Sequence, residues 1–333
     1  MDNLQGTQFI EAGRSLGHDF YRLSHLPRQT DWPRPVQEGF DAASAGQMRR
    51  VNADRFCRKW LQLRLQAWQR RRAVADDVTV ALLRHLDVTH CPVTREHLTH
   101  GERSDTDWSV DRLNNDGAYA ASNLAILSVH ANRAKGSLHF DEVLQLARRD
   151  VATHGLEPVQ WQRLAALMVG PAFATRQAQA PVLPLCAPLP ACSVRLALQQ
   201  IQRLFTLQAR RPSGKNALVR DFRRACPTPQ AAQHLRTLAD LVHDGLKALP
   251  DGLACWDVWL EPRVMDALVR WRAALDDRSW ATAAAVSGRL AGGQRVTPGS
   301  LERWCLPTRG YVPTGAAARA RHGRLGDHGL RLI

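Results

Sequence analysis

The sequence has few of the features that mark zinc-binding, secreted or membrane-spanning proteins. Its seven cysteines are scattered and odd in number, and no two of them form a C-x-x-C pair. No run approaches about 18 consecutive apolar residues, and the opening residues lack a basic-then-apolar pattern. We therefore expect a reducing compartment, no structural zinc, no membrane segment, and a cytoplasmic location.

Acidic residues are also scarce relative to basic ones. The 333 residues include 45 Lys and Arg against 31 Asp and Glu, which gives a net charge of +14. A chain of this charge favours a polyanionic partner, because each neutralised phosphate releases counterions. DNA is the expected polyanion. The alternative is that the charge is incidental, as in a helical interaction or scaffold protein.

Most of the chain has the apolar spacing of helices. Residues 48–72 hold nine basic residues and one acid, with Phe56, Trp60, Leu63 and Ala67 on one stripe. The basic back of this predicted helix has two open interpretations, a solvated face or direct phosphate contact. A second helix is predicted at 77–86, before Pro92 stops helical continuation.

A proline-rich stretch at 171–192 reads as an extended linker and sets the main predicted boundary. Helical patterns resume beyond it, and the last of them resembles a helix-turn-helix weakly. The sequence contains no internal repeat and no phosphate-binding glycine-rich loop. The predicted organisation is a basic helical N-terminal region at 1–88, a small mixed module at 89–136, a helical extension at 137–170, the linker at 171–192, a helical C-terminal domain at 193–310, and a basic flexible tail at 311–333.

The stretch "WSVDRLNNDGAYAASNLAILSVHANRAKG" differs from the helical remainder. Residues 108–113 alternate as a short strand, and "NNDGAYAAS" is rich in turn-forming residues. Residues 124–127 read as a second strand, and 128–135 favour a helix that Gly136 closes. The predicted order is strand, loop, strand, helix, with Ser137 as the N-cap of the next helix.

Three polar residues fall on these predicted elements or at their ends. Asp111 ends the first strand, Asn123 precedes the second, and Asn132 lies one turn into the helix. Carboxylate and amide oxygens are hard donors that suit Mg²⁺ or Mn²⁺. Lys135, three residues after Asn132, shares its side of the helix and is placed to hold a phosphate, whereas His130 should point away.

These motifs together resemble a known family, the HNH or ββα-metal endonucleases. The resemblance rests on "CPVT" at 91–94, "VDRL" at 110–113, "DGAYAASN" ending at Asn123 and "ANRAKG" ending at Gly136, and it covers about 46 of 333 residues. It implies a mainly α protein carrying one small ββα-metal module. It also implies that Asp111 and Asn132 are the protein ligands of a single divalent metal, and that Asn123 orients the general base and fixes the loop.

Arg112 departs from the commonest family pattern, which has His after the Asp. A guanidinium cannot take a proton from water, so Arg112 cannot be the general base. A subset of the family has Asp-Arg here, and Arg112 could instead hold the scissile phosphate bidentately. Several other residues are candidate bases, with nothing in their spacing to select one: His90, His97, His100 and Tyr119.

The resulting hypothesis is a metal-dependent DNA endonuclease with an HNH-like module and Mg²⁺ or Mn²⁺ as its cofactor. Arg112 and Asn123 are its catalytic candidates, and Arg133 and Lys135 its nucleic-acid contacts. A general base contributes roughly 10²- to 10⁴-fold, and the metal is expected to contribute more, so losing His would slow the enzyme without abolishing activity. The alternatives are a DNA-binding protein with an inactive module and a helical interaction protein.

Overall fold

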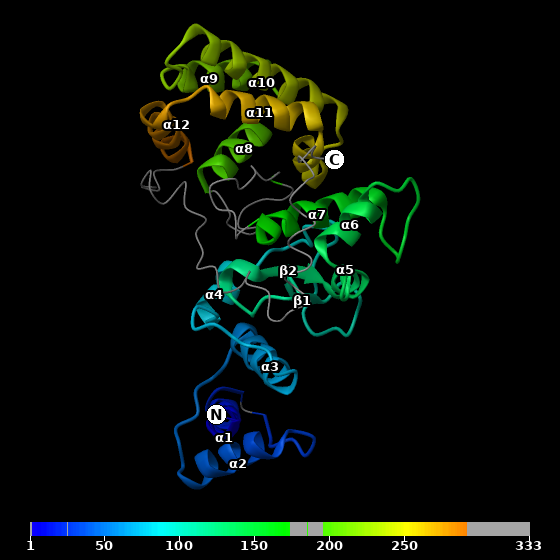
Figure 1. Cartoon of the computed structure of the whole chain (residues 1–333), viewed down its shortest axis with the longest axis vertical. Coiled ribbons are helices and arrows are strands. Elements are labelled where there is room, and N and C mark those ends of the chain that lie inside the picture. Colours follow the sequence, from blue (N-terminus) through cyan, green and yellow to red (C-terminus); the bar gives the residue numbers. More distant parts are fainter. Residues whose placement is uncertain (1, 25, 174–184, 186–195, 292–333) are drawn as a thin grey trace. The chain divides into compact units, whose positions relative to one another are not determined.

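The chain is mainly helical and carries one small two-stranded antiparallel sheet, which confirms the predicted fold class (Figure 1). The computed structural model describes residues 2–24, 26–173, 185 and 196–291. It divides into two compact units, one formed by residues 1–87 with 118–121 and the other by residues 88–117 with those after 121.

The N-terminal unit is built from four helices: α1 (Asp2–Ser24), α2 (Arg34–Ala45), α3 (Arg55–Gln69) and α4 (Val80–His85). Glycines let α1 and α2 touch along their backbones. A Cβ on Gly17 would lie 2.0 Å from the Val36 carbonyl oxygen, and one on Gly39 would lie 1.9 Å from the Arg14 carbonyl oxygen. The helices enclose an apolar cluster of Leu16, Phe20, Trp32, Val36, Phe40 and Leu61.

Capping residues shorten both helices predicted in this unit. The helix expected from residue 48 begins at Arg55, because the Asp54 carboxylate accepts the Cys57 amide at 2.9 Å and so caps it. The helix expected at 77–86 is α4, with the Thr79 hydroxyl at its N-cap. The spacing of apolar residues identified each helix, and the cap set where it begins.

The predicted strand, loop, strand, helix order is present between residues 108 and 135. Strand β1 (Trp108–Arg112) pairs antiparallel with β2 (Leu124–Ser128), with Trp108 opposite Ser128 and Arg112 opposite Leu124. A short 3₁₀ turn, η1 (Ala121–Asn123), leads into β2. Helix α5 (Val129–Lys135) follows at once, with the Ser128 hydroxyl capping it through the Ala131 amide.

Two helices follow this module, α6 (Phe140–Ala147) and α7 (Pro158–Phe173). The predicted N-cap at Ser137 is wrong, since α6 has His139 at that position. Gly136 ends α5 with φ +48°, and the Leu138 amide still bonds back to the Lys135 carbonyl. The chain therefore needs two more residues before α6 starts, and the Glu142 carboxylate then accepts the His139 amide at 2.8 Å.

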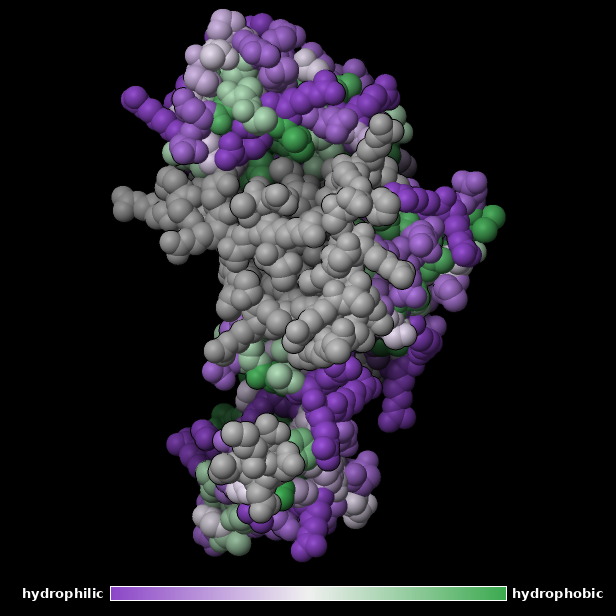
Figure 2. Space-filling view, viewed as in Figure 1, coloured by the Kyte–Doolittle hydropathy of each residue, from purple (hydrophilic) through white to green (hydrophobic). Residues whose placement is uncertain are grey.

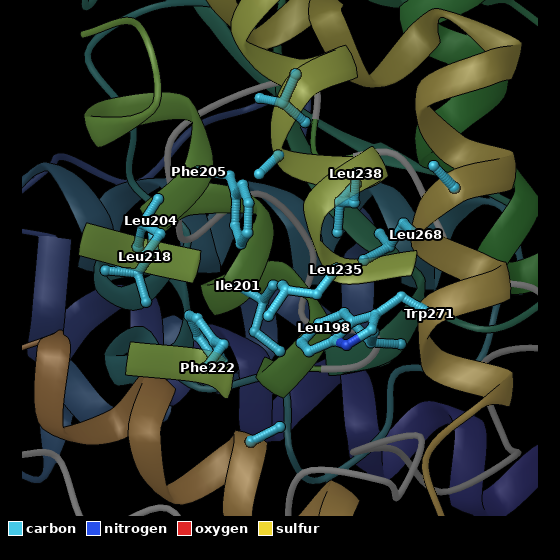
Figure 3. Close-up of a cluster of buried hydrophobic side chains, with 14 of the residues drawn as sticks. Leu198, Ile201, Leu204, Phe205, Leu218, Phe222, Leu235, Leu238, Leu268 and Trp271 are labelled. Carbon is cyan, nitrogen blue, oxygen red and sulfur yellow. The ribbon is translucent and has the colours of Figure 1, made fainter. Parts of the chain in front are cut away.

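The C-terminal helices pack around a single apolar core (Figure 3). They are α8 (Leu196–Gln208), α9 (Pro212–Arg223), α10 (Pro229–Ala248), η3 (Gly252–Leu260), α11 (Pro262–Ala273) and α12 (Asp277–Leu290). Helix α9 was not predicted from the sequence, because its buried side chains, Leu218 and Phe222, make too narrow an apolar stripe. In Figure 3, Phe205, Leu235 and Trp271 point toward one another from different helices.

The predicted boundary at 171–192 does not separate two compact units. Residues on both sides of it belong to the same unit. Most of that segment lies outside the described residues, as do the predicted tail at 311–333 and the second half of the weak helix-turn-helix pattern.

The surface hydropathy and the helix lengths are relevant to the expectation that the protein has no membrane segment. On the face shown in Figure 2, hydrophilic residues and smaller hydrophobic patches are interspersed over the C-terminal helices. Within the described residues, no helix is both long and apolar enough to cross a membrane.

Candidate metal and phosphate site

Helix α5 lies against strand β1 and brings two of the predicted site residues, Asp111 and Lys135, into contact. Ser109 and Asp111 are two residues apart on β1 and so share a face of the strand. Asn132 and Lys135 are three residues apart on α5 and share a side of the helix. Figure 1 shows α5 beside the hairpin, and each helix residue contacts one strand residue: Asn132 contacts Ser109, and Lys135 contacts Asp111.

Asp111 is a buried carboxylate that forms an ion pair with Lys135. Its side chain is 6% exposed, and the Lys135 Nζ lies 3.2 Å from Oδ1 and 3.1 Å from Oδ2. Among the described residues, Oδ2 therefore has an ion-pair partner but accepts no hydrogen bond. Burial raises the pKa of Asp111 above its ordinary value, and the charge of Lys135 opposes this only in part.

Lys135 is fully buried, which corrects its predicted role as a phosphate contact. Besides Asp111, its Nζ donates to the Arg112 carbonyl oxygen at 2.8 Å and to Asn115 Oδ1 at 3.3 Å. An ammonium enclosed by three acceptors holds the strand and the loop after it together. Because its Nζ is buried, Lys135 is not exposed to a phosphate at the surface.

Asn132 lies in the middle of α5, and its side chain contacts β1. Its Nδ2 donates to the Ser109 hydroxyl at 2.7 Å, which fixes the rotamer of the amide. The amide oxygen is not used in this bond and keeps its lone pairs. Ser109 was not singled out in the sequence, although its spacing of two residues from Asp111 placed it on the same strand face.

Asn123 and Arg112 both hold the loop that joins the strands. Asn123 is fully buried, and its Oδ1 accepts the Asn114 amide at 2.7 Å while its Nδ2 donates to the Asn114 carbonyl at 2.9 Å. Arg112 Nη1 donates to the carbonyl oxygens of Asn115 and Gly117 at 2.9 and 2.8 Å. These bonds make both residues positioning groups for the loop.

Asn115 is a member of this network that sequence reasoning missed. Its Oδ1 accepts from Lys135, and its Nδ2 donates to the Gly136 and Leu138 carbonyl oxygens at 3.2 and 3.3 Å. It therefore ties the loop to the segment after α5. The sequence signal was only a second Asn in a turn, which is common in turns of every kind.

Arg133 lies on the outside of the module. Its guanidinium forms an ion pair with Asp105 at 3.0 Å, and the two side chains are 69% and 64% exposed. An exposed pair of this kind is weak and opens readily. Contact between Arg133 and nucleic acid stays a prediction that this geometry permits.

The candidate bases have different surroundings. His90 and His97 stack edge-to-face with ring centroids 5.3 Å apart, and His100 packs on Trp108 in the same manner. Tyr119 is buried in the N-terminal unit, where its backbone bonds to Ala73 and Ala75. The sequence did not point to His139, whose Nδ1 lies 3.7 Å from Asp116 of the loop.

The donor set is compatible with a single hard cation. Among the described residues no cluster of three or more His, Cys, Asp or Glu side chains could hold a metal. The predicted site uses one carboxylate and one amide instead, and the buried carboxylate of Asp111 supplies the hard oxygen donors that a cation would use. The Lys135 ammonium works against this binding, because it lies within 3.2 Å of both carboxylate oxygens.

Cys91 explains why the "CPVT" turn belongs to the module. Its buried sulfur lies 3.3 Å from the Ser128 amide and 3.5 Å from the Thr94 amide, and both donate to it. The turn is thereby fixed to the end of β2, where α5 begins.

No known protein family, curated protein or solved structure matches this chain.

Proposed function

We propose that this protein hydrolyses phosphodiester bonds in DNA with one Mg²⁺ or Mn²⁺ ion, through the module formed by β1, β2 and α5. One observation carries the proposal. Asp111 is a buried carboxylate, paired with Lys135, on the face of β1 that α5 covers with Asn132. The net charge of +14 supports a polyanionic substrate.

Each residue of the module has a distinct part in this proposal. Asp111 and Asn132 would hold the ion through a carboxylate and an amide oxygen. When bound, such an ion polarises a phosphate oxygen and stabilises the leaving oxygen. Arg112 and Asn123 hold the loop, and Lys135 keeps Asp111 in place. The general base stays unassigned.

A plasmid-cleavage assay with added Mg²⁺ or Mn²⁺ tests the proposal. Asp111→Asn keeps the shape of the side chain and removes its charge, so cleavage should fall by roughly 100-fold or more, because metal ions contribute several kcal/mol. Asn132→Ala should also reduce cleavage. Asp141→Asn, an exposed carboxylate on α6, is the matched control and should cleave like the wild type.

Thermal unfolding of each variant shows whether it is folded at the assay temperature. Cleavage by folded Asp111→Asn and Asn132→Ala at the wild-type rate would refute the assignment. Chelation by EDTA should abolish cleavage by the wild type.

A second candidate function is DNA binding without cleavage, and a specific observation favours it. Lys135 already neutralises both oxygens of Asp111, and Arg112 occupies the position of the usual base while bonding the loop. In that case wild-type protein would bind duplex DNA and leave it intact with either ion. If binding were also undetectable at about 50 mM salt, where phosphate contacts are strong, the protein would be a helical interaction protein.

A further inference from the structure

The N-terminal unit contains a cleft that the nuclease proposal does not use. It has a volume of about 930 Å³ and lies between α1, α3 and residues 71–79. Its lining combines aromatic rings with guanidinium groups: Phe9, Trp60 and Trp68 with Arg64, Arg71 and Arg72. All of these residues belong to one compact unit.

The aromatic rings in the cleft are held in place. Phe9 and Trp68 stack with centroids 4.2 Å apart and planes 11° from parallel, and the Trp68 indole donates to the Phe9 carbonyl at 2.9 Å. The Trp60 indole donates to the Val78 carbonyl at 2.7 Å. Each ring is half-buried, so one part packs against the unit while another faces the cleft. Rings fixed in this way lose little entropy when a ligand stacks on them.

Guanidinium groups lie against these rings. Arg64 lies over Trp60 at 4.3 Å from the ring centroid and forms an ion pair with Asp19. Arg71 lies over Phe9 at 5.4 Å, and both Arg71 and Arg72 are exposed at the rim. A guanidinium plane can stack on a base and also bind a phosphate, so these side chains serve both parts of a nucleotide.

The apolar cluster of the unit accounts for the inner edges of Trp60 and Trp68 but not for the arginines. A purely structural cluster has no need for exposed basic residues along its opening. Asp76, which is also exposed in the lining, is the one group of opposite charge at the rim. The rim therefore carries two positive charges and one negative charge, and this net positive charge favours an anionic ligand.

We infer that this cleft binds an unpaired strand of nucleic acid, with a base against the aromatic rings and the flanking phosphates on Arg71 and Arg72. Stacked duplex bases expose only their edges, so the rings select unpaired bases. The inference goes beyond the proposed function. It needs no metal and would hold if the β1–β2–α5 module proved inactive.

Fluorescence anisotropy with the full chain in EDTA tests this inference. The probes are a labelled oligothymidylate of about 12 nucleotides, the matching duplex, and thymidine monophosphate as competitor. Phe9→Leu keeps the apolar volume without the ring and should weaken oligothymidylate binding roughly 5- to 150-fold, the range of one lost stacking contact. Phe9→Tyr should restore binding.

Charge variants separate the phosphate contacts from the stacking. Arg71→Ala with Arg72→Ala should weaken strand binding and reduce the slope against salt by about 1.4, since each single-strand phosphate contributes about 0.7. Asp76→Asn should tighten binding. Arg58→Ala is the control: it is exposed on α3, but two residues from Trp60 and thus on the opposite face.

Three outcomes would overturn the inference. One is equal loss of duplex and strand binding in Phe9→Leu, which would mean that the rings do not select unpaired bases. Another is thymidine monophosphate binding as tightly as the oligonucleotide, which would make the cleft a mononucleotide site. The third is unchanged strand binding in Phe9→Leu, in Arg71→Ala with Arg72→Ala, and in Asp76→Asn, when each variant has the same unfolding temperature as the wild type and is therefore folded.

Discussion

At the residue scale, Lys135 is the predicted site residue whose observed contacts differ most from the expected ones. A lysine three residues after a candidate ligand looked like a surface phosphate contact, and the structure places it at zero exposure against Asp111. A buried ammonium is tolerated only with partners, and its three acceptors come from β1 and the loop. The sequence placed Lys135 on the same side of the helix as Asn132 but did not indicate that it pairs with Asp111.

This pairing predicts a large asymmetry between two basic residues of the same helix. Lys135→Met should destabilise the protein by about 3–5 kcal/mol, because it leaves Asp111 buried without its counter-charge. Arg133→Met, which breaks only an exposed ion pair, should cost less than about 1 kcal/mol. Urea unfolding of the two variants measures the difference, and equal small effects would show that Lys135 is not buried.

The same variant tests whether Asp111 accepts a cation. Without the ammonium, the carboxylate should bind a divalent ion more tightly, so millimolar Mn²⁺ should raise the unfolding temperature of Lys135→Met more than that of the wild type. Lys135→Met combined with Asp111→Asn is the control and should show no such gain. A gain in that double variant would place the ion elsewhere.

At the scale of elements, the loop before β1 depends on one carboxylate. Asp107 accepts the Thr99 hydroxyl at 2.7 Å and the Glu102 and Arg103 amides at 3.2 and 2.8 Å. Burial is the largest single influence and raises the pKa of Asp107, but the hydroxyl and the amides together lower it below its ordinary value. The ionised carboxylate thus closes the loop at 99–107 that leads into β1.

A lowered pKa has a defined consequence for stability. The unfolded chain binds the proton at higher pH than the folded chain, so the contribution of Asp107 is present above its ordinary pKa of about 3.9 and is lost as pH falls through the lower folded value. Asp107→Asn should therefore be less stable than the wild type at neutral pH, and the gap should shrink in acid. Thr99→Val should show a smaller part of the effect. Urea unfolding across this pH range measures the gap, and a gap that stayed constant would contradict the prediction.

At the scale of the whole molecule, two arginines connect the module to the C-terminal helices within one unit. Asp257 of η3 accepts Arg95 from the "CPVT" turn at 2.9 Å, and Arg163 of α7 binds both of its oxygens at 2.9 and 2.6 Å. Arg163 also donates to the Val93 carbonyl at 2.8 Å. These contacts explain why the predicted boundary at 171–192 does not divide the fold.

Removing Asp257 should affect the whole unit. Asp257→Ala leaves two nearly buried guanidiniums without their carboxylate and should destabilise the protein by about 3–5 kcal/mol. Asp240→Ala, whose carboxylate pairs with Lys215 and is 58% exposed, should cost less than about 1 kcal/mol. Calorimetry should show earlier unfolding only in the first variant, and similar curves for both would mean that the three-residue contact is not stabilising.

The sequence by itself determined the helical character, the hairpin and α5, because apolar spacing and turn residues act over a few neighbours along the chain. It also placed Asp111 at the end of the first strand, Asn123 before the second, and Asn132 one turn into the helix. Only the tertiary structure decided what these residues contact. Asp111 and Lys135 are 24 positions apart and Arg163 and Asp257 are 94 apart, and local patterns carry no information on such pairs. The aromatic cleft likewise joins Phe9 and Trp68 across 59 positions, through packing of α1 on α3 that no local pattern specifies.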